Sequence, residues 1–391
     1  MIRFFRTDMA LVWGAVLLLT AGLGVSFIGL TPSPDRDFFF YQAFVESLAS
    51  GTLDLSIPGF HGSNIFAVPL YWITHSSLAE IELQMIYAIL LPVSAYLAGA
   101  SLFRSRWYGL VLAGIVTMSP FVSMISGIGY TAAGYWVLML ITLYGAGERK
   151  WWTGIAWGLA ILTKPFALAL LPVLWIYRPE QGSLWKRHHI ILLGLTIPVL
   201  AALFQYVQAG HVIVGVHPEL NEASVWQEPM KILLNAAYAL QILFSVHNYH
   251  YPNPGGTGHE NLLHTTPLLM FLGIFALIAQ RQYFTERKLP AALLIGAILG
   301  FGMNAVVATM NEYYMQAGML LLILAALPVL KKYPLWIPFV LATLHFQWFY
   351  FFLAFGERLH LITIFFAAPI VVDMLFVIWF LQQWRWFLRL E

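Results

Sequence analysis

The sequence predicts an all-α membrane protein that crosses the bilayer many times. Apolar residues make up 60% of the 391 residues and charged residues only 10%, against about 45–50% and about 25% in soluble domains. Apolar runs recur along the chain, several of them near the roughly 20 residues that a helix needs to span a bilayer. Short loops between the runs carry most of the lysines and arginines, as cytoplasmic loops do. We therefore expect a single transmembrane domain over residues 1–391.

The composition also excludes several classes of protein. The net charge is only +2, and no basic cluster marks a nucleic-acid-binding face. The chain contains no cysteine, which excludes disulfides, thiolate zinc sites and cysteine nucleophiles. We therefore expect no nucleic-acid partner.

Ten apolar runs predict membrane spans. They cover residues 9–30, 83–103, 107–125, 131–146, 190–209, 266–280, 289–309, 314–330, 334–355 and 361–384. The first run is too long for a signal peptide, and no small-residue cleavage site follows it. With the hairpin described next counted as two helices, we expect a bundle of about 12 transmembrane helices.

The apolar stretch 151–177 has Thr163-Lys164-Pro165 at its middle. Proline breaks a helix, and two arms of about 13 residues reach only about 20 Å each. We expect a re-entrant-like hairpin over 151–177, with Lys164 at its tip near the outer face. The hairpin places both termini and 16 of the 20 lysines and arginines on the cytoplasmic side, whereas a single span would leave only eight there. The four outer cations are Arg36, Lys164, Lys231 and Arg358.

Two outer loops are long, 31–82 and 210–265. The first predicts an amphipathic helix over 35–50, because one apolar stripe recurs there at helical spacing. The stripe consists of Phe38, Tyr41, Val45 and Leu48. The second loop contains the apolar stretch 229–246. A membrane span there would move every later loop to the opposite side of the membrane. We therefore interpret this stretch as an interfacial helix on the outer face.

Two carboxylates, Asp35 and Asp37, fall in the first turn of the predicted helix. They would complement the helix dipole, which stabilises a helix by about 0.3–1 kcal/mol for each charge. One of them would also suit a general base at the membrane surface. The spacing alone leaves both interpretations open.

The first outer loop contains a series of residues that recur in a known family. In order along the chain, they are Asp37, Tyr41, Leu48, Gly51 and the run Pro69-Leu70-Tyr71-Trp72. In this order the loop resembles that of the GT-C superfamily of membrane glycosyltransferases, with aminoarabinose transferases and protein O-mannosyltransferases as the nearest branch. The hairpin segment Leu162-Thr163-Lys164 is similar to the Leu-Thr-Lys segment of the same family. These motifs cover residues 1–180, and the remainder resembles the family in topology.

Three positions depart from the family pattern. Phe38 replaces a second acid, and Val68 stands where aminoarabinose transferases carry a lysine that contacts the lipid phosphate. Glu312, in Glu312-Tyr313-Tyr314, stands where relatives often carry arginine. The departures leave the identity of the donor and its mode of phosphate binding open.

The resemblance implies a GT-C-like bundle that moves a sugar from a polyprenyl-phosphate donor to an acceptor hydroxyl at the outer face. It implies Asp37 as the general base, with Asp35 as the second candidate. No cofactor is expected; related oligosaccharyltransferases use a divalent metal, for which Asp35 and Asp37 would be the ligands here. The candidates for binding the donor phosphate are Lys164, Arg36, Arg358, Tyr313 and Tyr314. The candidates for other substrate contacts are Tyr41, His61, Tyr71, Tyr130 and Glu312.

Several of these residues have a structural interpretation as well. Lys164 would extend its amine to the interface, Arg358 would pair with Glu357, and the tyrosines would form an aromatic belt. Two other functions also compete. A polymerase or ligase of lipid-linked envelope glycans would be expected to carry more outer-loop arginines. A lipid-glycan transporter or flippase would be expected to hold more intramembrane charge than Asp373 and His345 provide.

The loop charges predict a multi-pass protein of a bacterial plasma (inner) membrane, with its active site facing outward. The expected partners are the bilayer and the lipid-linked sugar. The acceptor is left open among glycans, lipids and proteins.

Overall fold

The computed structural model describes residues 2–28, 30–34, 36–57, 61–118, 125–177, 183–210, 212, 230, 232–233, 288–305, 316–337, 340, 365 and 367–382. These residues form helices and connecting turns, with no strand among them. The predicted all-α class therefore holds for the described part of the chain. The predicted spans 266–280 and 334–355 lie outside it almost entirely, as does the predicted interfacial helix 229–246.

Three helices are long and apolar enough to cross a membrane. They are α1 (Ile2–Ser26), α4 (Ala79–Phe103) and α10 (Leu184–Ala209), through the segments Met9–Ser26, Ala79–Phe103 and His188–Ala209. The chain is a membrane protein by this criterion. The predicted number of about 12 transmembrane helices stays a prediction.

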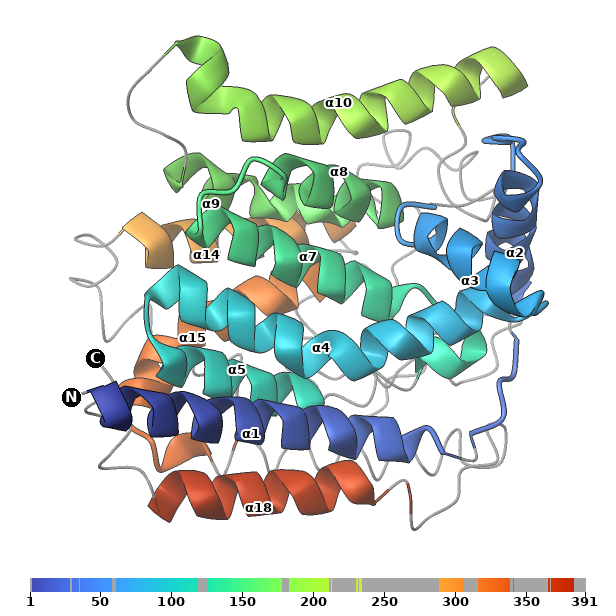
Figure 1. Cartoon of the computed structure of the whole chain (residues 1–391). Coiled ribbons are helices and arrows are strands. Elements are labelled where there is room, and N and C mark those ends of the chain that lie inside the picture. The colour runs from blue at the N-terminus through green and yellow to red at the C-terminus, as the bar shows by residue number, and fades with distance from the viewer. Residues whose placement is uncertain are drawn as a thin grey trace.

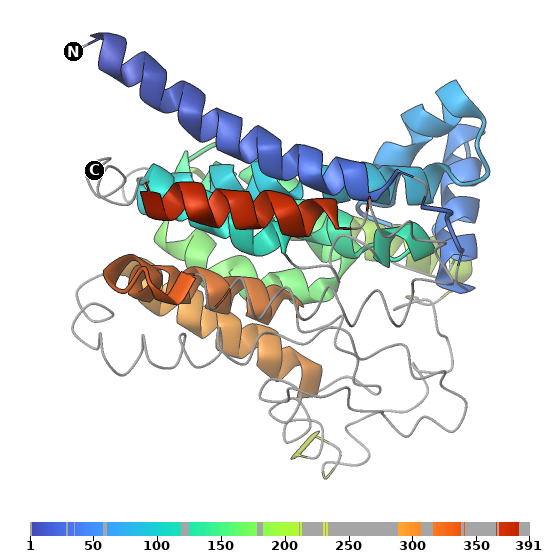
Figure 2. The ribbon, with the colours of Figure 1, turned by 90° about the horizontal axis from the view of Figure 1, so that it is seen from below.

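Shorter helices complete the bundle. They are α5 (Arg106–Thr117), α7 (Ala132–Gly147), α8 (Thr153–Thr163), α9 (Leu171–Ile176), α14 (Lys288–Ala305), α15 (Gln316–Lys332) and α18 (Ala368–Gln382). In Figure 1 these helices and the three long ones run roughly along one direction. α4 packs against α5 and α7, α8 packs against α7 and α10, and α1 packs against α18. Figure 2 shows α14 and α15 on one side of the other bundle helices.

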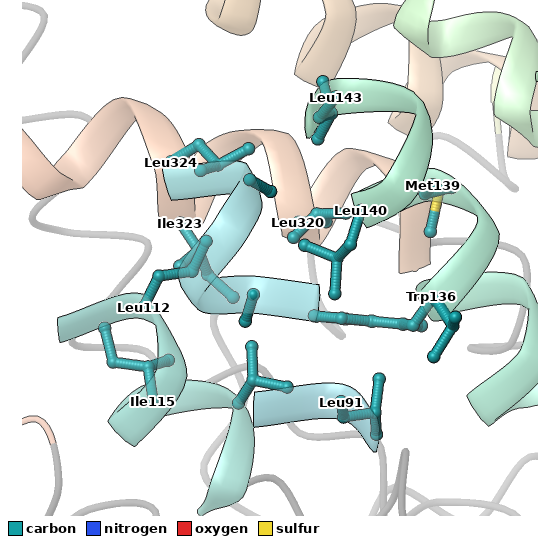
Figure 3. Close-up of a cluster of buried hydrophobic side chains, with 14 of the residues drawn as sticks. Leu91, Leu112, Ile115, Trp136, Met139, Leu140, Leu143, Leu320, Ile323 and Leu324 are labelled. Atoms are coloured by element: carbon teal, nitrogen blue, oxygen red, sulfur yellow. The ribbon is translucent and has the colours of Figure 1, made fainter. Parts of the chain in front are cut away.

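Large apolar side chains fill the centre of the bundle. Figure 3 shows Leu91 of α4, Leu112 of α5, Trp136 of α7 and Leu320 of α15 converging there. All four are almost fully buried. Burial removes these side chains from both water and lipid, so close packing of apolar groups holds these four helices together.

The segment 151–177 leaves and returns to the same end of the bundle. α8 ends at Thr163, and Lys164 has an extended backbone (φ −154°, ψ 124°) before the 3₁₀ helix η3 (Pro165–Leu170) and α9. The two arms are tied where Trp157 Nε1–H donates to Ala167 O at 2.8 Å. Tyr177 donates to Leu102 O, at the end of α4 far from Ala79. Lys164 therefore lies at the opposite end, where α4 begins.

That opposite end carries the first outer loop. It contains α2 (Arg36–Ala49), the 3₁₀ helix η1 (Asn64–Phe66) and α3 (Ala67–Thr74). α2 runs across the direction of the bundle helices (Figures 1 and 2). Phe38, Tyr41, Phe44 and Val45 bury its inner face, and the Gln42 amide oxygen accepts the Glu80 N–H at 3.2 Å. α2 is therefore fixed to the first turn of α4.

Candidate functional site

Asp37 and Lys164 come together at this end of the bundle. Asp37 lies in the first turn of α2 and is half-buried. Lys164 is also half-buried, in the break between α8 and η3. The Asp37 carboxylate acts electrostatically on the Lys164 ammonium, whose Nζ lies 5.9 Å from the centre of the Tyr135 ring. The structure thus joins a carboxylate and a cation from two distant parts of the sequence.

Tyr41 and His61 pack beside this pair. Tyr41 lies one turn after Asp37 and is buried. Its ring meets the His61 ring edge to face, with the ring centres 5.9 Å apart. His61 stacks flat on Phe44 at 4.0 Å and an interplanar angle of 6°. Both predicted contact residues therefore belong to the cluster around α2.

His61 is neutral in the folded protein. Burial lowers the pKa of its imidazole from 6.5 to about 4, although the hydrogen bond to Ile57 O and the Asp54 charge act in the opposite direction. Nε2 lies 3.1 Å from Ile57 O, so Nε2 carries the proton and Nδ1 presents a lone pair. A neutral imidazole adds no positive charge to this cluster.

Gly62 sets the distance between the outer loop and the hairpin. Its N–H donates to Leu162 O at 3.3 Å. A Cβ at Gly62 would collide with Leu159 O and with Thr163 N. Only glycine lets the backbone approach the last turn of α8 so closely. The loop therefore lies directly against the turn that presents Lys164.

An apolar groove of about 340 Å³ lies beside the cluster, between α2, the loop that follows it, the end of α8 and α10. Leu162 and Pro165, which flank Lys164 closely in sequence, are among its lining residues, as is His61. The other lining residues are Phe44, Leu48, Leu53, Leu55, Ile65, Ile161, Pro198, Ala201, Ala202, Phe204, Gln205 and Val212. Almost every group in the groove is apolar, so it suits a hydrocarbon chain.

Two other predicted contact residues lie at the edge of this region. Tyr130 is half-buried in the turn between η2 (Ile125–Ile128) and α7. The preceding Gly129 has φ +86°, and a Cβ there would lie 2.6 Å from Phe38 Cβ, so this turn packs on the start of α2. Tyr71 lies on α3, and its ring packs against His75 at 6.3 Å rather than against His61.

The remaining candidates lie outside the described residues. They are Asp35, Glu312, Tyr313, Tyr314 and Arg358. Arg36 begins α2, and its side chain is not described. Within the described ranges, no three carboxylates or imidazoles gather closely enough to hold a metal ion.

The structure adds a buried polar cluster that the sequence reasoning missed. Glu80 is fully buried in the first turn of α4, next to Gln84 one turn further on. The Gln84 amide oxygen accepts the Gly134 N–H at 2.9 Å, and Tyr87 donates to Ser63 O at 3.3 Å. Polar residues spaced four apart in an otherwise apolar span were the signal available in the sequence. The cluster joins α4, α7 and the loop that carries His61.

No family model and no curated protein matches the chain. Among solved structures, the chain is similar to the Archaeoglobus fulgidus oligosaccharyltransferase, crystallised with an acceptor peptide containing the NVT sequon tethered through a disulfide bond. The identity is 13% and the TM-score 0.43, over 92% of this chain and 55% of the other. This chain thus spans about half the length of that protein.

Proposed function

We propose that this protein is a membrane glycosyltransferase that moves a sugar from a polyprenyl-phosphate donor to an acceptor hydroxyl. The observation that carries the proposal is the electrostatic interaction of Asp37 with Lys164, together with an apolar groove lined by Leu162 and Pro165, which lie close to Lys164 in sequence. A lipid-linked donor has a phosphate at one end and a long hydrocarbon chain behind it. The cation and the groove match these two parts, and the carboxylate matches the proton that the reaction releases.

The proposed reaction is a displacement at the anomeric carbon. The acceptor oxygen forms a bond to that carbon while the bond from the carbon to the phosphate oxygen breaks. The phosphate leaves with the electron pair, and Lys164 stabilises its developing charge. Asp37 takes the proton of the acceptor hydroxyl as general base. The two groups would act on opposite sides of one carbon, and the electrostatic interaction between Asp37 and Lys164 supports this arrangement.

The groove would hold the first part of the polyprenyl chain. Each Å² of apolar surface that leaves water contributes about 25 cal/mol to binding, before the cost of ordering the chain. The chain would fix the phosphate near Lys164. His61, neutral and lining the groove, would accept a hydrogen bond from a hydroxyl of the donor.

The proposal also includes the face of the membrane. The charge pattern of the loops supports an outer position for α2 and Lys164, and we propose a bacterial plasma membrane as the site. Polyprenyl-phosphate sugars would reach the site from that leaflet. The sugar and the class of acceptor (glycan, lipid or protein) are left open.

The variant Asp37→Asn tests the chemistry directly. It keeps the size of the side chain and removes its basicity, so we expect transfer to fall about 10²–10⁴-fold while binding of polyprenyl phosphate persists. The assay would follow a radiolabelled sugar from a synthetic polyprenyl-phosphate donor into membrane extracts. Asp54→Asn makes the same change in the same loop, where the carboxylate caps Ser56, and serves as the control. Near-normal transfer by Asp37→Asn would refute this mechanism.

A further inference from the structure

Helix α10 packs in two different ways along its length. Its first part lies tightly on α8 through glycines of both helices. A Cβ at Gly154 would lie 2.6 Å from Ile190 O, and one at Gly158 would lie 2.9 Å from Gly194 O. A Cβ at Gly194 would collide with the Trp157 ring. Glycine contacts of this kind allow close backbone approach in membranes, so this part of α10 is fixed to α8.

Pro198 marks the end of the tightly packed part. It lies inside α10 and has no N–H to donate to the carbonyl of Gly194, four residues earlier. A proline therefore removes one hydrogen bond from the helix and weakens it locally. The position divides α10 into a fixed part and a part that follows the proline.

The part after Pro198 forms one wall of the apolar groove. Ala201, Ala202, Phe204 and Gln205 line it. Neighbouring side chains on the other faces, such as Val207 with 80% exposure, point away from the protein. Among the described elements, α10 packs mainly on α8 and also touches α9. This wall therefore separates the groove from the surroundings of the bundle, which in a membrane are lipid.

Two glutamines tie the end of this wall to the first outer loop. The Gln208 amide donates to Leu53 O at 2.7 Å and accepts the Leu55 N–H at 2.9 Å. The Gln205 amide donates to Leu55 O at 2.9 Å. Leu53 and Leu55 themselves line the groove. The bonds of Gln208 are exposed, so water can replace them at little net cost.

We propose that the part of α10 after Pro198 is a lateral gate, hinged at Pro198 and latched by Gln205 and Gln208, that admits the prenyl chain of the donor from the bilayer. This inference rests on the proposed function and adds the route by which its donor reaches the groove. The hydrogen bonds of the latch connect one helix to one loop segment. When they break, the wall moves outward while the glycine contacts hold the rest of α10 on α8.

The chain contains no cysteine, which makes a reversible lock straightforward. The double variant Leu55→Cys with Gln208→Cys would be joined by a short bis-methanethiosulfonate cross-linker in nanodiscs. Undecaprenyl phosphate is then supplied from vesicles, and the bound lipid is measured over time by native mass spectrometry. We expect the lock to slow lipid uptake about tenfold or more, with full recovery after dithiothreitol. Each single cysteine variant, treated with the same reagent, should take up lipid at the same rate before and after dithiothreitol, because one cysteine cannot be cross-linked across the latch.

A second variant works in the opposite direction and needs no cross-link. Gln205→Ala with Gln208→Ala removes the latch, so lipid should both bind and dissociate several-fold faster. Equal uptake by the locked and reduced proteins would overturn the gate and leave the proposed function standing. Absence of lipid binding even in the unmodified protein would overturn both.

Discussion

The Asp37 carboxylate and the Lys164 ammonium come from two segments that the sequence separates widely. Each segment carries its own reason for placing the residue. Asp37 stands in the first turn of α2, where a negative charge stabilises the helix. Lys164 stands where Pro165 ends the hydrogen bonding of α8. Tight contact between the loop and α8 at Gly62 brings the two segments together.

Substitutions of Lys164 test phosphate binding separately from the transfer reaction. Lys164→Met keeps an unbranched apolar stem and removes the charge. Loss of a charge-assisted hydrogen bond costs about 1.5–3 kcal/mol, so affinity for polyprenyl phosphate should fall roughly 10–100-fold. Lys164→Arg should retain most of the affinity. Binding would be measured by titration in nanodiscs, and unchanged affinity in Lys164→Met would assign the phosphate to another cation.

His61 predicts a dependence of stability on pH. Its pKa is about 4 in the folded protein and 6.5 as the ordinary value, so between these values the unfolded chain binds the extra proton. The stability that neutral His61 provides is therefore complete above about pH 6.5 and is lost as the pH falls toward 4. His61→Phe keeps the stacking on Phe44 and should flatten the fall in melting temperature over this range. The exposed His75, changed to Phe, is the control, and the same slope in His61→Phe and the unmodified protein would contradict this assignment.

At the scale of elements, the contact between the outer loop and α8 depends on the missing side chain of Gly62. Gly62→Ala forces a methyl group against backbone atoms of Leu159 and Thr163, which cannot move aside as a flexible side chain could. We expect a loss of about 1–3 kcal/mol in unfolding free energy and reduced transfer, because Lys164 shifts from Asp37. Gly24→Ala, where a Cβ meets nothing within 4 Å, is the matched control. Thermal unfolding in detergent should give a lower melting temperature for Gly62→Ala than for Gly24→Ala. Equal melting temperatures would show that the contact at Gly62 is not tight.

Patterns within one element were predictable from the sequence. The apolar stripe at Phe38, Tyr41 and Val45 follows helical spacing, and all three side chains are buried in α2, together with Phe44 and Gln42. Pro165 predicts a helix end just before it, and α8 ends at Thr163. Both follow from local backbone chemistry. The predicted roles of Asp35, Arg358, Tyr313 and Tyr314 stay predictions.

Contacts between elements were not predictable in the same way. The glutamines of α10 resemble ordinary polar residues at the end of a span, and only the fold shows that they bind the backbone of Leu53 and Leu55. Glu80 likewise resembles a first-turn acid until its full burial is seen. Tyr71 belongs to the motif that carries the resemblance, yet it packs with His75. Such pairings depend on packing between distant segments, which one sequence does not encode in any short pattern.

At the scale of the whole molecule, the described helices form an apolar centre and, at one end, a region that combines charged groups with an apolar groove. The centre of the bundle is filled with apolar side chains (Figure 3). The end that carries α2 gathers Asp37, Lys164, His61 and the apolar groove. A lipid-linked donor requires this combination at one membrane surface, because its phosphate stays in the polar layer while its chain stays in hydrocarbon.

The central claim is that a polyprenyl phosphate binds with its headgroup at Asp37 and Lys164. A cryo-EM map of the protein in nanodiscs with added polyprenyl phosphate tests this most directly. The proposal predicts headgroup density within hydrogen-bonding distance of Lys164 and chain density in the groove beneath α10. Lipid density elsewhere, or a continuous path across the membrane between the helices, would contradict the proposal and favour a transporter.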